Sequence, residues 1–175
     1  MSPFFDIYHC SPTRITKILK DNSWGDVDFS GCIFFALQPY ALGSCDYLYR
    51  MELTDEDVIE VCFLDPAVLI NTDNWSGTAS EKIIRYASVY DINIDEEDAE
   101  DLLCENRAAF RILDGIEDPE ARGYLEWYIQ GIQGRAAHAM GYTVAQSHDE
   151  QGTVYIAYLH GKEHLLTLCE QDSDD

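Results

Sequence analysis

Positive charge is scarce in this sequence. Its 175 residues include 11 Lys and Arg against 33 Asp and Glu, so the formal net charge at pH 7 is −22. Nucleic acids and anionic lipids are bound through Lys and Arg side chains that neutralise phosphates, so we expect neither as a partner. The charge favours a basic protein, which is either modified chemically or blocked by acidic mimicry of a nucleic acid. Solubility or adaptation to salt is the alternative explanation of the acidity.

Clustered cysteines and long apolar runs are also lacking. The six cysteines are spread along the chain without a C-x-x-C pair, and this spacing indicates neither a zinc framework nor a disulfide scaffold. No histidine or cysteine stands at metal-ligand spacing, so no metal is expected. No apolar run approaches the length of a membrane span, and the first residues do not resemble a signal peptide. We therefore expect a protein of the reducing cytoplasm.

The length and the remaining composition indicate one folded domain. Hydrophobic residues make up 46% of the chain and aromatic residues 12%, which is typical of a globular protein. A chain of this length supports one core more readily than two. We expect a single domain over residues 1–175, with an acidic tail at 170–175 that is frayed.

Periodicity and capping signals predict an α+β fold with mainly antiparallel strand pairing. The predicted strands are 4–9, 32–37, 57–64, 67–70, 142–147, 153–159 and 165–168, where 142–147 and 153–159 form a hairpin. The predicted helices are 12–20 with Ser11 as its N-cap, 40–51, two segments between 78 and 113 of which the second starts at Asp95, and 118–140.

Three places in the chain carry candidate functional side chains. His9 ends a predicted strand, Phe34 lies in an aromatic strand, and Asp149 and Glu150 occupy the hairpin turn. Each has an ordinary structural explanation: a hydrogen-bonded histidine, a core aromatic ring, and acidic residues in a surface turn. Only their combination points to a site.

That combination resembles the diphtheria-toxin-like and poly(ADP-ribose) polymerase group of ADP-ribosyltransferases. Residues 8–13 (YHCSPT) resemble the H-G-[ST] element on the first strand of that group, and 33–36 (IFFA) resemble its G-I-Y-F-A strand. Residues 44–47 (SCDY) are similar to its S-x-x-x-x-Y helix. The stretch 135–153, which contains MGYT and DEQGT, resembles phage-encoded anti-CRISPR ADP-ribosyltransferases.

The resemblance implies an NAD cleft between split antiparallel β-sheets flanked by helices. His9 is then expected to hydrogen-bond a ribose hydroxyl of NAD, the Cys10 backbone to hold the nicotinamide amide, and Tyr47 to stack on the nicotinamide ring. Ser11 and Phe34 belong to the same cofactor-binding set. The chain departs from the family pattern at Cys10, where relatives carry glycine, and at Phe34, where many carry tyrosine.

The carboxylate of the hairpin turn is the expected catalytic group. Asp149 is expected to bind the 2′-hydroxyl of the nicotinamide ribose and to stabilise the positive charge that develops as the glycosidic bond breaks. Glu150 is the alternative catalytic residue. Because an aspartate replaces the family's glutamate, we expect transfer of a single ADP-ribose to a protein, such as a CRISPR-Cas component in a bacterial host cell. A non-catalytic acidic mimic and an RNA 2′-phosphotransferase of the same fold are the other hypotheses.

Overall fold

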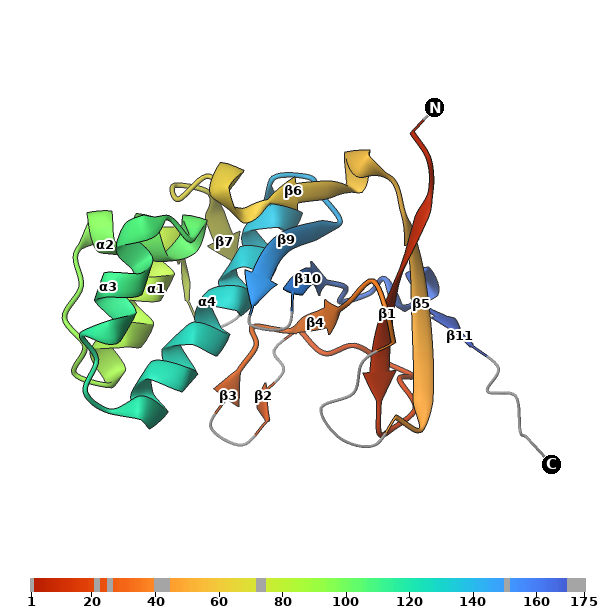
Figure 1. Cartoon of the computed structure of the whole chain (residues 1–175), viewed down its shortest axis with the longest axis horizontal. Coiled ribbons are helices and arrows are strands. Elements are labelled where there is room, and N and C mark those ends of the chain that lie inside the picture. Colours follow the sequence, from red (N-terminus) through yellow and green to blue (C-terminus); the bar gives the residue numbers. More distant parts are fainter. Residues whose placement is uncertain are drawn as a thin grey trace.

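The structure is a computed structural model that describes residues 2–20, 23–24, 27–39, 45–71, 75–149 and 152–169. Its helices and strands confirm the predicted α+β class. The two larger β-sheets and a group of helices follow one another along the longest axis of the molecule (Figure 1).

The first sheet has the order β1-β5-β11 and is antiparallel throughout. It consists of β1 (Phe5–Ser11), β5 (Tyr47–Leu53) and β11 (Thr167–Leu168). Alternate residues of β5 are buried from Tyr49 to Leu53, and Ile7 of β1 is fully buried, because one face of the sheet packs on the protein core.

The second sheet has the order β4-β10-β9-β6. It consists of β4 (Cys32–Phe35), β10 (Gly152–Tyr158), β9 (Val144–Asp149) and β6 (Val58–Glu60). The pair β6–β9 is parallel and the other pairs are antiparallel. The hairpin predicted near the end of the chain is confirmed as β9 and β10.

The helices lie on one side of the second sheet, where the longest of them packs on the sheet and the others lie beyond it (Figure 1). The helices are α1 (Ala79–Val89), α2 (Glu96–Cys104), α3 (Arg107–Asp114) and α4 (Pro119–Ala139). The shorter elements are β2 (Ser23–Trp24), β3 (Val27–Asp28), β7 (Leu69–Asn71), β8 (Ser76–Thr78) and three 3₁₀ turns, η1 (Asp55–Asp57), η2 (Val61–Phe63) and η3 (Glu163–Leu165).

Apolar side chains fill both sides of the second sheet. Between the two sheets lie Ile7, Phe35, Met51, Val144 and Leu159, among others. On the opposite side, apolar residues of α4 pack on the sheet, and those of α1 and α2 extend the same core. Burial of one such Ile or Leu side chain stabilises the fold by about 1.5–3 kcal/mol, so the second sheet is fixed from both faces.

Two glycines let α4 approach the second sheet closely. A Cβ atom on Gly131 would lie 2.5 Å from the Phe29 carbonyl oxygen, and one on Gly134 would lie 2.7 Å from Cys32 Sγ. The helix predicted at 118–140 is confirmed in spite of these glycines, and Gly141 follows it with a φ of +91°.

Three of the predicted elements are wrong. Residues 12–20 form no helix, and Ser11 is the last residue of β1 rather than an N-cap. The predicted helix 40–51 overlaps β5, while 40–44 lie outside the described residues. The strand predicted at 57–64 is reduced to β6 between two 3₁₀ turns.

The helix predicted from Asp95 is interrupted at Glu105. This residue adopts a left-handed backbone conformation with a φ of 52° and separates α2 from α3. Its Oε1 accepts hydrogen bonds from Gln133 Nε2 and from Ser147 Oγ, which come from α4 and β9. These contacts offset the cost of the left-handed conformation, which is about 1–3 kcal/mol for a residue other than glycine.

Candidate functional site

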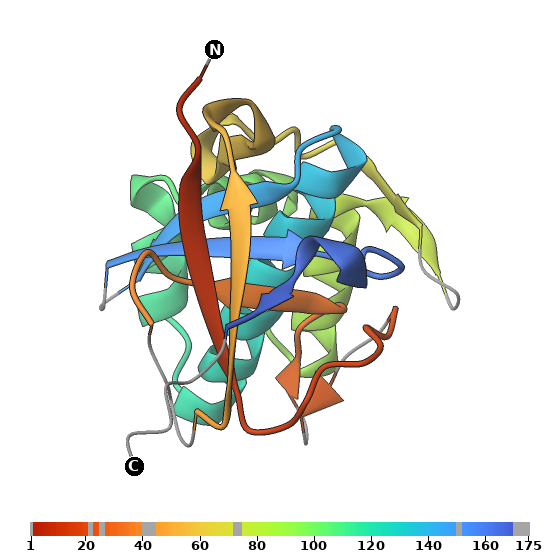
Figure 2. The same cartoon turned by 90° about the vertical axis from the view of Figure 1, so that its right-hand side faces the viewer.

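The two sheets meet where β1 passes the end of β4. The Tyr8 N–H donates to the Ala36 carbonyl at 2.8 Å, and the Ala36 N–H donates back to the Tyr8 carbonyl at 3.0 Å. In Figure 2 the red β1 and the yellow-orange β5 stand upright in front of β4, β9 and β10, which run across the view. We call this contact the sheet junction.

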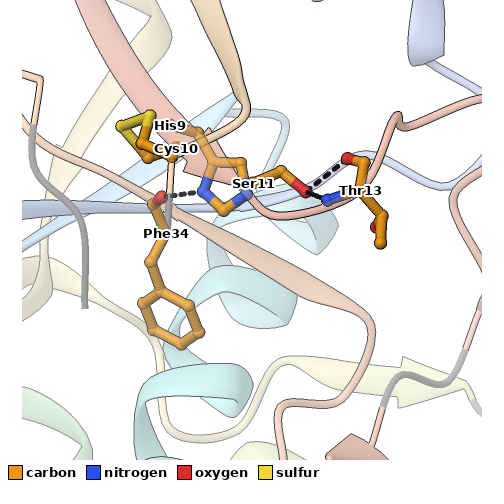
Figure 3. Close-up of a disulfide and its surroundings, with 6 residues drawn as sticks. His9, Cys10, Ser11, Thr13 and Phe34 are labelled. Carbon is orange, nitrogen blue, oxygen red and sulfur yellow. Dashed lines mark hydrogen bonds between the residues drawn. A yellow bond between two sulfur atoms is a disulfide. The ribbon is translucent and has the colours of Figure 1, made fainter. Parts of the chain in front are cut away.

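His9 lies at the sheet junction. Its Nδ1 is 2.8 Å from the carbonyl oxygen of Phe34 (Figure 3). Because a carbonyl oxygen only accepts hydrogen bonds, Nδ1 carries the proton, and Nε2 of the neutral ring is left as an acceptor. Burial lowers the pKa of His9 below its ordinary value of 6.5, and the hydrogen bond to Phe34 acts in the opposite direction with a smaller effect. The neutral ring is therefore the form present at pH 7.

The side chains of His9, Ser11 and Tyr47 share the inner face of the first sheet. Residues directly opposite each other in an antiparallel pair project to the same face, and Ser11 pairs with Tyr47 while His9 pairs with Tyr49. Ile7, two residues before His9, belongs to the core between the sheets, so this face is turned to the second sheet. The structure thus brings together three of the residues predicted to bind NAD.

Ser11 is more constrained than the sequence suggests. Its hydroxyl donates to the Thr13 carbonyl at 2.6 Å and accepts from the Thr13 N–H at 3.2 Å (Figure 3). This local turn directs the chain out of β1 and occupies both the donor and one acceptor site of the hydroxyl.

The backbone of Cys10 faces the junction. Because both backbone groups of Tyr8 bond to Ala36, the groups of every second residue of β1 point away from β5. The N–H and C=O of Cys10 therefore project to the same side of β1 as those of Tyr8, where they are available to a ligand amide.

The side chain of Cys10 forms a disulfide with Cys45, and this finding corrects one prediction. The spacing of the six cysteines indicated no disulfide scaffold, but Cys10 and Cys45 are joined across 35 residues of sequence (Figure 3). The bond links the residue after His9 to the segment that enters β5, two residues before Tyr47. Spacing along the chain does not reveal the pair because the fold alone brings the two residues together.

Phe34 reaches the junction with its carbonyl group and not with its ring. The ring points away from His9 (Figure 3) and packs against Phe29 and Trp127, with ring centroids 5.4 and 5.6 Å away. The ring lies on the helical side of the second sheet, because Phe34 packs against the core cluster of that side and Trp127 belongs to α4. A contact between Phe34 and a cofactor at His9 would therefore be made by the backbone of Phe34.

The acidic turn belongs to the same sheet as β4. Asp149 is the last residue of β9 and pairs with Gly152, and β10 connects that pair to the pair of Tyr155 with Phe35. The turn thus follows the end of β4 that leads to Ala36 and the sheet junction. The side chain of Asp149 and the whole of Glu150 lie outside the described residues.

Tyr49 is a site residue that the sequence analysis missed. It lies opposite His9, is 4% exposed, and its hydroxyl accepts a hydrogen bond from the Ile15 N–H at 2.7 Å. The segment after β1 is thereby held against β5. In the sequence, apolar and charged residues alternate over 49–53 (YRMEL). This alternation is the signal that would have placed Tyr49 on a strand.

Neither a metal-ligand cluster nor a membrane-spanning helix is found in the part of the chain that the structure describes. Within the described ranges, no group of three or more His, Cys, Asp or Glu side chains is placed to hold a metal ion. None of the helices in that part of the chain combines the length and apolar character needed to cross a bilayer.

The chain is similar to known proteins in structure rather than in family or sequence. No family model and no curated protein matches the chain. A solved structure described as "Crystal structure of an anti-CRISPR protein" is similar to it with a TM-score of 0.48 and 21% sequence identity. The alignment covers 88% of this chain and 89% of that one.

Proposed function

We propose that this protein is a mono-ADP-ribosyltransferase that binds NAD at the sheet junction and transfers ADP-ribose to a basic protein. The observation that carries the proposal is the inner-face group of His9, Ser11 and Tyr47 beside the backbone groups of Cys10 that point away from β5. The motifs that suggested NAD binding from the sequence are thus neighbours in space, although they are about 25–40 residues apart in the chain.

Each of these groups suits a part of NAD. The Nε2 acceptor of His9 binds a ribose hydroxyl, and the hydrogen bond from Nδ1 to the Phe34 carbonyl fixes the orientation of the ring. The N–H and C=O of Cys10 match the acceptor and donor of the nicotinamide carboxamide. The ring of Tyr47 supplies a stacking surface at the same end of the sheet.

The chemical step needs one carboxylate and no metal. Nicotinamide leaves with the electron pair of its bond to the ribose C1′, and positive charge develops on the sugar. A preorganised carboxylate, assigned here to Asp149, stabilises that charge more than it stabilises the bound substrate. A nucleophile of the acceptor protein then bonds to C1′ and releases its proton.

A component of a CRISPR-Cas complex is the proposed acceptor. The resemblance of residues 135–153 to anti-CRISPR ADP-ribosyltransferases supports this assignment. Such complexes present basic surfaces that hold nucleic acid, and a chain of net charge −22 is attracted to them.

Incubation with labelled NAD and host lysate, followed by mass spectrometry, tests the proposal. The wild-type protein at substoichiometric amounts should add one ADP-ribose to a partner protein, and Asp149→Ala should lose at least about 100-fold of the rate. Full activity of Asp149→Ala would assign catalysis to Glu150, while absence of labelling by the wild type would refute the enzymatic function.

A non-catalytic blocker of a nucleic-acid-binding protein is the second candidate. The exposed face of α2 favours it, since Glu96, Glu97 and Glu100 are all exposed and form no ion pair among the described residues. A blocker would act without NAD and would need one molecule per target, whereas an enzyme acts catalytically.

A further inference from the structure

A cavity of about 500 Å³ lies among the helices, and all of its lining residues come from 90–121. It is formed by the segment after α1 and by the junction of α3 with α4. Its apolar lining comes from Ile92, Ile94, Ile112, Ile116 and Ala121. We call this cavity the helical groove.

The rim of the helical groove is acidic. Four carboxylates line it, and Arg111 is the one cation among its lining residues. The four are Asp91, Asp98, Glu117 and Asp118, of which all but Asp98 are exposed. Asp98 and Asp118 also accept backbone hydrogen bonds as caps of α2 and α4, which fixes their carboxylates in place.

The lining does not suit a small polar ligand. Sites for small molecules combine apolar walls with a few polar groups that converge inside the pocket. Here the buried lining residues, Ile94 and Ala121, are apolar, and Asp91, Glu117 and Asp118 are exposed at the rim. An apolar floor inside a ring of one charge sign instead matches a peptide segment that carries apolar anchors and basic neighbours.

We propose that the helical groove docks a basic amphipathic segment of the protein partner. The inference rests on the proposed basic protein partner, and it does not depend on NAD chemistry. Apolar side chains of the segment, spaced as on one face of a helix, pack on Ile112 and Ile116, while Lys or Arg side chains face Asp91 and Glu117. We choose a basic occupant because its positive charge is complementary to the acidic rim and to the net negative charge of the chain.

The position of the groove makes it an exosite. In Figure 1 the helices α1–α3 lie at one end of the longest axis, and β1 and β5 of the sheet junction lie toward the other. A partner bound in the groove therefore leaves the NAD-binding group uncovered. Docking there should govern affinity for the partner without changing how NAD is held.

Binding of a defined peptide tests the inference. The probe is a fluorescein-labelled helix of about 18 residues, built from Lys with Leu at i, i+3, i+4 and i+7, and its fluorescence polarisation is followed at low salt. Asp91→Asn combined with Glu117→Gln should raise the Kd at least about fivefold, because two rim charges are lost. Asn at position 91 tolerates the positive φ of 57° found there.

A charge-matched variant supplies the control. Glu52→Gln combined with Glu56→Gln removes two exposed carboxylates from β5 and η1, away from the groove, and should change the Kd less than about twofold. A second peptide, in which Ser replaces every Leu, should bind more weakly. Equal weakening by both double variants, or equal binding of both peptides, would mean nonspecific charge attraction and would overturn the inference.

The outcome can be separated from that of the proposed function. The binding assay contains no NAD, and the groove variant should retain the wild-type affinity for NAD. If the peptide binds as expected while labelled NAD is never transferred, the docking site stands and the blocking function replaces catalysis. If NAD is transferred but the groove variant binds the peptide as tightly as the wild type, only the docking site fails.

Discussion

At the scale of single residues, the protonation of His9 links the stability of the fold to pH. Its Nδ1 is committed to the Phe34 carbonyl, and burial lowers its pKa below 6.5. The unfolded chain therefore binds a proton near pH 6.5 that the folded protein takes up only at lower pH. The stability contributed by the neutral ring is complete above pH 6.5 and is lost as the pH falls through the folded pKa.

The variant His9→Asn tests this linkage. The Asn amide stands where Nδ1 stands and can still donate to the Phe34 carbonyl, but it does not titrate. We expect the variant to melt near the wild-type temperature at about pH 7.5 and to lose less stability than the wild type toward about pH 5.5. His138, whose pKa burial also lowers, leaves a residual slope. Parallel melting curves for the two proteins over this range would contradict the role given to His9.

At the scale of elements, α4 depends on glycine where it meets the second sheet. Gly131→Ala forces a methyl group against the Phe29 carbonyl and should lower the free energy of unfolding by about 1–3 kcal/mol. Gly123 lies in the same helix with nothing within 4 Å of its Cβ position, so Gly123→Ala should stabilise by up to about 1 kcal/mol. Urea unfolding measures both, and equal effects of the two substitutions would show that packing at Gly131 is not close.

The disulfide ties β1 to the segment that enters β5. Its closure of a loop between positions 10 and 45 should contribute about 2–4 kcal/mol, chiefly by restricting the unfolded chain. Cys45→Ser should therefore lower the melting temperature, and a reductant should lower that of the wild type to the same value. Cys169→Ser, which removes a free cysteine, is the control. A wild-type melting temperature that does not respond to reductant would rule out the bond.

Sequence patterns predicted correctly those helices and strands that are stabilised by contacts within their own segment. The hairpin at 144–158 and the long α4 follow alternation and capping signals that lie within each segment. The helix predicted over 12–20 is wrong because side chains from distant segments bond its backbone in a non-helical conformation. Tyr49 Oη accepts from the Ile15 N–H, and the Glu163 carboxylate accepts from the Ile18 N–H. No pattern within 12–20 reports such partners.

The candidate site divides in the same way. The sequence placed His9 on the first strand, but it placed Tyr47 in a helix, whereas Tyr47 begins β5 and pairs with Ser11. It missed the Cys10–Cys45 bond and the outward turn of the Phe34 ring, since each depends on where other segments pack. Tyr49 was missed although its alternation was visible in the sequence.

At the scale of the whole molecule, the two proposed sites lie apart. The two sheets meet at the inner-face group around His9, and the helical groove is lined by residues of the helices, which lie at the other end of the longest axis (Figure 1). A net charge of −22 attracts basic proteins to any part of this surface. The proposed binding of NAD, which is itself negatively charged, would instead depend on hydrogen bonds and stacking at the sheet junction.

Calorimetric titration of the protein with NAD is therefore the most direct test of the account. We predict binding of one NAD per chain with a Kd between roughly 1 μM and 1 mM, and a loss of that binding in His9→Asn, which keeps the fold but lacks the Nε2 acceptor. A folded wild-type protein that gives no binding heat at millimolar NAD, or a His9→Asn variant that binds as the wild type does, would contradict it.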